Sequence, residues 1–456
     1  MITAVILLDF IRVEFGAPPS VMLLPELLSG IALLFCASGF ARNGMVLQSK
    51  YLVLFLILLV STALGLIIAE ATVGPVVGGM RIYLRWIPFF LLPLFYPFTE
   101  KQLRVQMMLI LLLMLSQAPL SFLQRFVFYA GFSGDEARGT FSSGSQGAIV
   151  ALSTIAVVVS LFQKRVLGGL AAIAATGILF LPSTVGEVKG AFVLMPFAIW
   201  IPILLLPNKT ALHSRHAVLA AILTVGALVS FSVIYSLAES THLRSLAGKD
   251  HRTNILDLLT NPDAILNYLA PRSSGDVNAN RYGRVDGVTI AIKELNQEPM
   301  KLISGLGMGA VTNAPFSFFA SDQHKGLRIA GKAKVTLSVL IWELGLLGTG
   351  LVLAGLALLW FDALKLRYWE GLYGALGLAW TVVIPIFVLA MLWKNTLINN
   401  PVMFLFALFT GHMLAGVRLQ HESQVGVEKT DDPESESMGF PSILSEPRPP
   451  ALLNAR

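Results

Sequence analysis

Two arginines stand at the start of an amphipathic segment late in the chain. Arg281 and Arg284 precede a stripe of apolar residues with helical spacing, formed by Val285, Val288, Ile292 and Leu295. Positive side chains are unfavourable at the first turn of a helix, because the helix dipole is already positive there. The two arginines therefore predict a bound anion, best a phosphate or diphosphate that also meets free backbone N–H groups. The alternative is a pair of solvated arginines that pair with Asp276 or Asp286.

The same polar segment contains the glycine run Gly305-Leu-Gly-Met-Gly309. The run follows no buried strand and lacks the Lys-Ser/Thr ending of a nucleotide-binding loop, so it does not predict a nucleotide site. Glycine accepts positive φ and lets the backbone approach a neighbour closely. We therefore predict a tight turn that brings the backbone against a neighbouring helix or a ligand.

The composition is typical of a membrane protein. Of 456 residues, 55% are hydrophobic and 13% are charged, whereas soluble domains carry roughly 25% charged residues. Apolar runs long enough to cross a hydrocarbon core of about 30 Å recur along the chain, so we predict an all-α, polytopic membrane protein. The single cysteine, Cys36, excludes an intrachain disulfide. The N-terminal apolar stretch has no basic leader region and no cleavage site, so no cleaved signal peptide is expected.

Eleven apolar runs predict transmembrane helices, and the shorter segment 2–18 is the candidate for a twelfth. The eleven segments are 21–40, 51–69, 81–98, 104–127, 146–162, 166–183, 189–206, 217–237, 335–360, 373–393 and 401–417. The predicted domains are an N-terminal transmembrane bundle (1–237), a large, partly helical outer loop (238–334), a C-terminal group of three helices (335–417) and a disordered cytoplasmic tail (418–456).

Basic residues in the short connections set the expected orientation. They fall in every second connection, at Arg42, Lys50, Lys101, Arg104, Lys164, Arg165, Lys209, Arg215, Lys365, Arg367 and Arg418. Under the positive-inside rule this side of the membrane is cytoplasmic. The connections 70–80, 128–145, 183–188 and 394–400 and the segment 236–334 are then expected on the outer side.

Charged residues also occur at the expected outer ends of several spans. Arg138 precedes one span, Glu187 and Lys189 precede another, and Arg81 and Arg85 lie one turn apart in a third. Each alone fits an anchor that extends to the lipid headgroups. Together they place basic residues where the positive-inside rule expects few, and an anionic lipid-linked substrate is one explanation.

Three ionisable residues lie within predicted spans. Glu343 is about 12 Å into its helix, at about 1.5 Å per residue, where a carboxylate costs a few kcal/mol unless it is paired or protonated. Glu343 has a functional interpretation and a structural one, a hydrogen bond between helices. The same two interpretations apply to His412 and Glu26.

Several short motifs follow one another in a fixed order. Arg-Gly-Thr-Phe (138–141) precedes a span, and Gly-x-x-Lys-Gly (186–190) begins a later one. The late loop contains Tyr-Gly-Arg (282–284), the glycine run and a histidine, and Trp-Glu-Leu-Gly-Leu-Leu-Gly (342–348) follows in the next span. In this order and sidedness the chain resembles the bacterial O-antigen ligase and polysaccharide polymerase family over most of residues 20–417.

The resemblance implies a glycosyltransferase that moves a glycan from undecaprenyl diphosphate, in the bacterial inner membrane, at a site that faces the periplasm. The residues that it implies at the diphosphate are Arg138 and Arg284, with Arg281 and Lys189 as further matches. His324 is implied near the acceptor hydroxyl and is the first candidate for a catalytic base, with Glu187 and Asp286 as alternatives. The sequence has no Asp-x-Asp pair in an outer segment and no His/Cys cluster, so neither a metal nor another cofactor is expected.

The resemblance leaves two activities open. A polymerase of exopolysaccharide or O-antigen adds the glycan to another lipid-linked repeat unit, whereas a ligase adds it to lipid A core. We favour the polymerase because the outer loop is long and because His324-Lys325 stands where the family commonly has His-Asn. The expected partners are undecaprenyl-diphosphate-linked oligosaccharide, the bilayer and assembly proteins such as a chain-length regulator, with no nucleic acid.

Two other classes of protein remain alternatives. A transporter or lipid flippase predicts charged residues inside many spans and broken helices in matched halves. A non-catalytic scaffold of an envelope assembly predicts no loss of product when single arginines are replaced.

Overall fold

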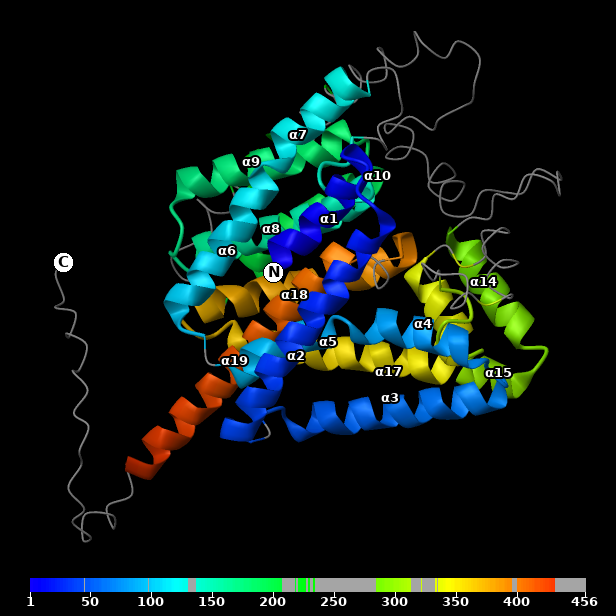
Figure 1. The fold of residues 1–456 in the computed structure, drawn as a ribbon. Helices are drawn as coiled ribbons and strands as arrows, with labels where there is room; N and C mark the ends of the chain where they lie inside the picture. Colours follow the sequence, from blue (N-terminus) through cyan, green and yellow to red (C-terminus); the bar gives the residue numbers. More distant parts are fainter. Residues whose placement is uncertain are drawn as a thin grey trace. The chain divides into compact units, whose positions relative to one another are not determined.

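In the structure, a computed structural model, helices are the regular secondary structure of the part of the chain that is described, and short turns and loops connect them (Figure 1). The described residues are 1–44, 46–96, 98–129, 137–206, 218, 220–226, 229, 233, 284–312, 321, 333, 335–395 and 400–430. The chain divides into two compact units, Met1–Val417 and Arg418–Arg456.

The N-terminal half supplies twelve described helical segments up to residue 204. They are α1 (Ile2–Glu14), η1 (Pro19–Leu23), α2 (Leu24–Asn43), α3 (Ser49–Ile68), α4 (Val73–Leu84), α5 (Ile87–Phe95), α6 (Glu100–Leu115), α7 (Gln117–Leu123), the π-helix η2 (Gln124–Phe128), α8 (Gly144–Gln163), α9 (Gly169–Val185) and α10 (Lys189–Leu204), with the described helical residues of 218–233 beyond them. Later in the chain follow α14 (Arg284–Leu295), α15 (Pro299–Ser304), α17 (Thr336–Leu366), α18 (Gly371–Trp393) and α19 (Asn400–Thr430).

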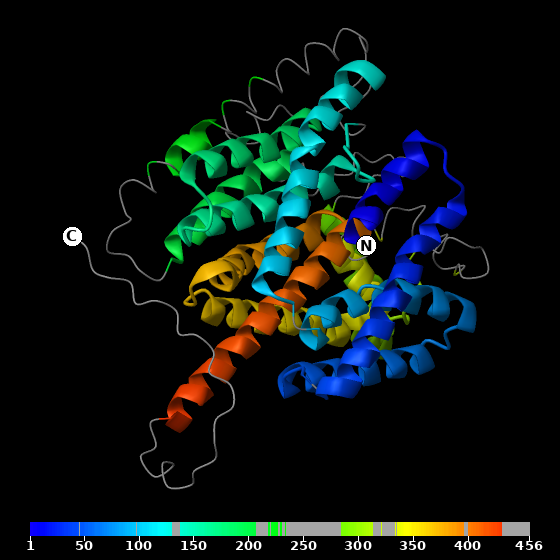
Figure 2. The same cartoon turned by 60° about the vertical axis from the view of Figure 1, so that its left-hand side comes forward.

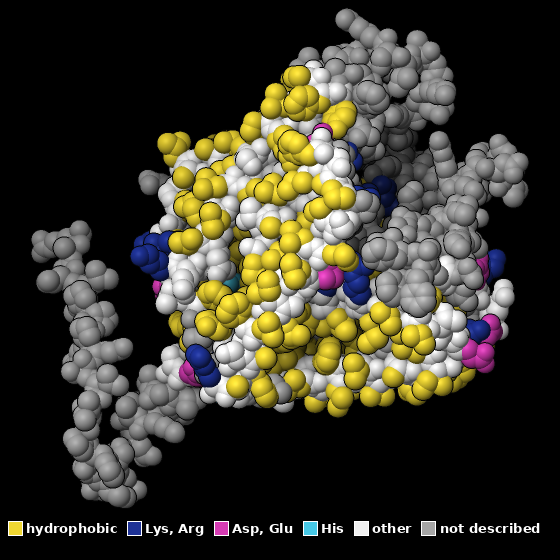
Figure 3. Space-filling view, viewed as in Figure 1, with side chains coloured by type: hydrophobic (Ala, Val, Ile, Leu, Met, Phe, Trp, Pro, Cys, Tyr) yellow, Lys and Arg dark blue, Asp and Glu magenta, His cyan; other side chains and the backbone are white. Residues whose placement is uncertain are grey.

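Seven of the described helices are long and apolar enough to cross a membrane. They begin with α2, α3, the continuous run α6–α7–η2 and α8, and continue with α17, α18 and α19; α9 and α10 are apolar but shorter. The expected polytopic helical membrane protein is therefore confirmed in its class. Hydrophobic side chains are spread widely over the face drawn in Figure 3, and charged side chains form a few small groups on it.

The membrane helices differ in how deeply they are buried within the protein. Of the 18 most apolar consecutive residues of α18, 78% are buried within the protein, compared with 17% of those of α3. α18 packs against α8, α10 and α17, and α8 packs against α9 and α10 (Figure 2). Phe387 of α18 stacks on Phe406 of α19 with ring centroids 4.3 Å apart. α8, α18 and α19 therefore form the core of the bundle. α2, α3 and α6 lie at its outside and expose apolar side chains that can face lipid.

The predicted boundaries differ from the structure at three places, and a fourth region lies mostly outside the described residues. Segment 81–98 is two helices, α4 and α5, which meet at Arg85 and Trp86, where Pro88 begins a new helix. Segment 2–18 contains the 13-residue helix α1, which is too short to cross alone. Most of 217–237 and of the predicted outer loop 238–334 lies outside the described residues, apart from α14, α15 and the turn that follows them. α19 continues to Thr430, beyond the predicted boundary at 417.

α17 is broken near its N-terminal end. Gly345 has φ 67° and ψ −172°, so the helix does not continue regularly through it. The carbonyl groups of Trp342 and Glu343 instead accept hydrogen bonds from the N–H groups of Leu306 and Gly307, at 2.7 and 3.0 Å. The turn after α15 therefore satisfies the backbone that the break in α17 leaves free.

The glycine run forms the close backbone contact that its composition predicts. Gly305, Gly307 and Gly309 all have φ between 78° and 88°. A side chain at Gly305 would collide with the Glu343 carbonyl, and one at Gly309 would collide with the Pro75 carbonyl. The run is thus a tight turn wedged between α17 and α4, and only glycine fits these positions.

Basic short connections meet at one end of the helix bundle. Lys50 forms an ion pair with Asp362 of α17 at 2.6 Å, and Lys164 donates to the Trp369 carbonyl at 2.7 Å. Burial lowers the pKa of Lys164, and Glu370 acts in the opposite sense. The connections 70–72, 137–143 and 186–188 belong to the opposite ends of their helices, which we call the Arg138 end.

Candidate functional site

The loop that carries Arg138 is fixed by two glutamines. Gln124 donates to the Gly139 carbonyl at 3.0 Å and accepts from the Gly139 N–H at 2.7 Å. Gln117 accepts from both the N–H and the hydroxyl of Thr140, at 2.8 and 3.1 Å. Phe141 is 2% exposed and anchors the end of the loop. The backbone that follows Arg138 is therefore held in place at three consecutive residues, Gly139, Thr140 and Phe141.

A buried ion pair joins this region to the turn between α9 and α10. Arg125, in the π-helix η2, donates to Glu187 Oε1 at 2.8 Å, with the two side chains 4% and 15% exposed. Glu187 has φ 53°, a left-handed conformation that is unfavourable for a residue with a side chain. π-helical turns and strained residues are concentrated at functional sites, and here one of each forms the same ion pair.

Tyr129 and Glu14 extend the polar group. The Tyr129 hydroxyl donates to Glu14 Oε2 at 2.9 Å, and Gln124 donates to Glu14 Oε1 at 3.3 Å. The hydrogen bond to Glu14 raises the pKa of Tyr129, and interaction with Arg138 acts in the opposite sense. Arg138, Arg125 and their partners Glu14, Glu187 and Tyr129 are hereafter called the arginine cluster.

The Arg138 loop and the Gly186–Gly190 motif lie against each other. A side chain at Gly186 would come within 3.2 Å of the Ala137 carbonyl, and one at Gly144 within 3.3 Å of Val188. Two motifs separated along the chain are thus adjacent at the Arg138 end of the bundle. Their small residues permit the close contact.

Arg284 reaches the same group of elements through a tryptophan. Its guanidinium lies 5.0 Å from the ring centroid of Trp393, at the end of α18, in a cation–π contact. The same ring also lies against Gly190, where a side chain would come within 2.7 Å of it. Trp393 therefore lies between α14, which begins with Arg284, and the start of α10.

The remaining predicted site residues differ in how far they are described. Asp286 lies in the first turn of α14, two residues after Arg284. Lys189 begins α10, although its side chain is outside the described part of the structure. Arg281 and His324 also lie outside the described residues. The structure thus brings together the elements that carry Arg138, Glu187, Lys189 and Arg284.

Several buried polar atoms near the Arg138 loop lack a hydrogen-bond partner. Among the described residues these are Ser121 Oγ, Ser143 Oγ, Gln146 Oε1 and Ser183 Oγ. Ser143 and Gln146 flank the start of α8, and Ser183 lies in the last turn of α9. Buried polar groups are normally paired, so these atoms provide hydrogen-bonding capacity beside the arginine cluster that a polar ligand can use.

Arg81 and Arg85 do not extend to the headgroups as anchors. Both contact Glu26 Oε1, at 2.8 and 3.2 Å, and their side chains are 19% and 9% exposed. The charges therefore join α4 to α2. Glu343 likewise has a structural set of partners: it accepts from the N–H groups of Val311 and Thr312, at 3.0 and 2.8 Å.

Sequence reasoning missed Arg125, Gln117, Gln124 and Trp393. The two glutamines lie seven positions apart inside a predicted span, so they share one helix face, and this spacing was the available signal. Arg125 and Trp393 lie at the ends of apolar runs, where such residues are common anchors. Nothing in their spacing identifies their partners.

No family model and no curated protein matches the sequence. Any assignment to a family therefore depends on the motifs and on their arrangement.

Proposed function

We propose that the protein is an integral-membrane glycosyltransferase that polymerises glycan repeat units carried on undecaprenyl diphosphate. The observation that carries the proposal is the meeting of the Arg138 loop, the Gly186–Gly190 motif and Arg284 at one end of the bundle. Cationic side chains from three separate elements suit a ligand with more than one negative charge.

The proposed reaction is glycosyl transfer without a metal. The bond between the anomeric carbon and the diphosphate oxygen breaks, the acceptor oxygen bonds to that carbon, and the acceptor proton passes to a base. Negative charge grows on the leaving diphosphate, and guanidinium donors from Arg138 and Arg284 stabilise it; one such donor is worth about 3 kcal/mol. Arg281 and Lys189 are proposed as further contacts to the diphosphate.

His324 remains the proposed base, with Asp286 as an alternative. The geometry supports a different role for Glu187, whose carboxylate accepts from Arg125 at 2.8 Å. In that role Glu187 holds the Arg125 guanidinium beside the Arg138 loop. At the start of α8, the buried Ser143 hydroxyl can donate to a sugar or phosphate oxygen, and the buried Gln146 Oε1 can accept from a sugar hydroxyl.

The test uses a strain that lacks the chromosomal gene and expresses each variant. Arg138→Ala and Arg284→Ala should abolish long polysaccharide on a gel, and Arg→Lys at either position should restore little, because a lysine cannot donate two parallel hydrogen bonds. Arg367→Ala, at the other end of the bundle, is the matched control and should retain polymer. Wild-type polymer from both alanine variants, at equal protein levels, would contradict the proposal.

A transporter or flippase is the second candidate, and the broken helix α17 favours it. Discontinuous helices with a buried carboxylate occur at the binding sites of secondary transporters, and Glu343 lies two residues before the break at Gly345. The number of repeat units on the acceptor lipid and the side of the membrane on which unextended units collect distinguish a polymerase from a flippase. A polymerase defect leaves single repeat units on the acceptor lipid at the outer face, whereas a flippase defect leaves them facing the cytoplasm.

If single repeat units are ligated normally but never extended, polymerase is favoured over ligase. Loss of all transfer to lipid A core, with polymer still attached to the carrier lipid, favours the ligase instead.

A further inference from the structure

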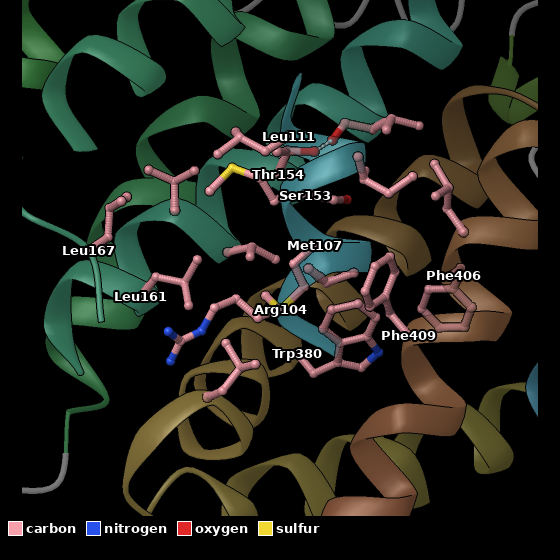
Figure 4. Close-up of a pocket in the computed structure, with 18 of the residues that line it drawn as sticks. Arg104, Met107, Leu111, Ser153, Thr154, Leu161, Leu167, Trp380, Phe406 and Phe409 are labelled. Atoms are coloured by element: carbon pink, nitrogen blue, oxygen red, sulfur yellow. Dashed lines mark hydrogen bonds between the residues drawn. The ribbon is translucent and has the colours of Figure 1, made fainter. Parts of the chain in front are cut away.

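A cavity of about 300 Å³ lies between α6, α8, α18 and α19, apart from the arginine cluster (Figure 4). Its walls are almost entirely apolar and include Met107, Leu111, Trp380, Phe406 and Phe409. The volume is at the low end of the range for small-molecule sites. Exposed Met108 belongs to the α6 wall, so the cavity opens sideways, toward the position of lipid.

The cavity is elongated along the helices. Its α8 wall extends from Ile149 to Leu161, about 18 Å at a rise of about 1.5 Å per residue. One leaflet of a bilayer has about 15 Å of hydrocarbon, half of a core of about 30 Å. The length of the cavity is therefore similar to the hydrocarbon thickness of one leaflet, which is the length that an acyl chain spans.

A positive charge lies at one end of the cavity. Arg104 of α6 is exposed and, within the described residues, forms no ion pair or hydrogen bond. In Figure 4 its guanidinium lies beside Leu161 and Leu167, and Trp380, Phe406 and Phe409 lie on the opposite side. Lys101 lies one turn before it on α6. An apolar slot with a cation at its end complements a lipid with a negative headgroup.

We propose that this cavity holds one acyl chain of an anionic phospholipid, such as phosphatidylglycerol, whose phosphate contacts Arg104. The orientation of the cavity distinguishes this lipid from a glycan carrier. A carrier whose diphosphate lies at Arg138 enters the bilayer from the other end of α8, so its headgroup cannot reach Arg104. The bound phospholipid fills the space between α6 and the core helices and stabilises the bundle.

The test measures lipid retention by the purified full-length protein with native mass spectrometry, with phosphatidylglycerol or phosphatidylcholine added in turn. The wild-type protein should retain more phosphatidylglycerol than phosphatidylcholine. Arg104→Gln should weaken this retention about fivefold, the effect of one basic residue on an anionic headgroup. Arg367→Gln, at the same end but outside the cavity lining, should bind as wild type does.

A second variant tests the cavity independently of the charge. Ser153→Phe places a ring in the cavity wall and should reduce retention of both lipids; if this variant does not fold, Arg104→Gln alone carries the test. Equal retention of the two lipids by wild type overturns the proposal, as does unchanged binding by Arg104→Gln. Displacement of phosphatidylglycerol by a short polyprenyl diphosphate at equal concentration also overturns it.

Discussion

At the scale of single residues, the Arg125–Glu187 pair is the most distinctive contact of the arginine cluster. Both side chains are mostly buried, and Glu187 keeps an unfavourable backbone conformation to make the contact. Removal of one member of a buried ion pair costs about 3 to 5 kcal/mol, because a charge stays behind in a poorly solvated place. The pair is therefore expected to stabilise the fold beside the Arg138 loop.

Replacement of Arg125 provides a direct test of this pair. Arg125→Met should lower the free energy of unfolding by about 3 kcal/mol, and Glu187→Gln should lower it less. The double variant should be more stable than the sum of the single effects predicts, since neither partner is left alone. Chemical unfolding of the detergent-solubilised protein measures all three.

Arg12→Met is the matched control, because Arg12 is an exposed arginine at the end of α1. It should change stability by less than about 0.5 kcal/mol. Strictly additive effects at Arg125 and Glu187 would show that the two side chains are not coupled.

Tyr129 predicts a dependence on alkaline pH. The folded protein raises the pKa of this phenol through its hydrogen bond to Glu14, so folding favours the protonated form. Its stabilising contribution is complete below the ordinary pKa of about 10 and is lost as the pH rises through the higher folded value. The melting temperature of wild type should therefore fall more steeply above about pH 10 than that of Tyr129→Phe; parallel curves would contradict the assignment.

Residue types and spacing predicted part of this site. Arg138 and Glu187 were identifiable because charges stand out against apolar runs, and Arg284 because it opposes a helix dipole. Their partners were not identifiable, since Arg125 and Glu187 are far apart in the sequence and only the packing of η2 on the α9–α10 turn brings them together. The roles proposed for Arg281 and His324 stay predictions.

At the scale of elements, the break in α17 and the turn after α15 form one unit. Gly345 needs positive φ, and a side chain there would collide with the Ile303 carbonyl and the Gly305 N–H. Tyr83 of α4 adds a hydrogen bond to Glu343 Oε2 at 2.8 Å. α4, α15 and α17 are therefore fixed to one another at the Arg138 end.

Two glycines of the same helix test the break. Gly345→Ala should destabilise the protein by more than about 2 kcal/mol, from positive φ together with backbone collision. Gly350→Ala, where a side chain meets open space, should be neutral or stabilising by up to about 1 kcal/mol. Thermal unfolding of both variants in one detergent compares them, and equal melting temperatures would show that Gly345 does not need its conformation.

The length of the apolar runs predicted the membrane helices better than it predicted their interruptions. Apolar runs mark α3, α8 and α18 directly, because lipid exposure and burial both require apolar side chains. The junction of α4 and α5 and the break at Gly345 lie within long stretches of high average hydropathy, so hydropathy does not reveal them. Pro88 and the Gly345–Gly348 spacing were the only local signals.

At the scale of the whole molecule, the separation of basic connections from the Arg138 end predicts a fixed orientation. In a Cys36→Ser background, Ser142→Cys lies in the Arg138 loop and Lys101→Cys at the opposite end; both positions are exposed. The positive-inside rule expects the loop outside. A membrane-impermeant maleimide should label Ser142→Cys in intact cells and Lys101→Cys only after permeabilisation, and the reverse pattern would invert the proposed topology.

The break in α17 also constrains how the chain is made. During insertion, residues 336–366 reach the translocon as one continuous apolar segment, yet the finished helix exposes two carbonyl groups that lipid cannot satisfy. The N–H donors that satisfy them, on Leu306 and Gly307, are synthesised earlier, and in the proposed topology they cross the membrane before α17 is inserted. We therefore expect α17 to leave the translocon for the bilayer only as the turn after α15 packs against it. A variant in which this turn packs more slowly should accumulate an incompletely folded protein that cellular proteases degrade during membrane insertion.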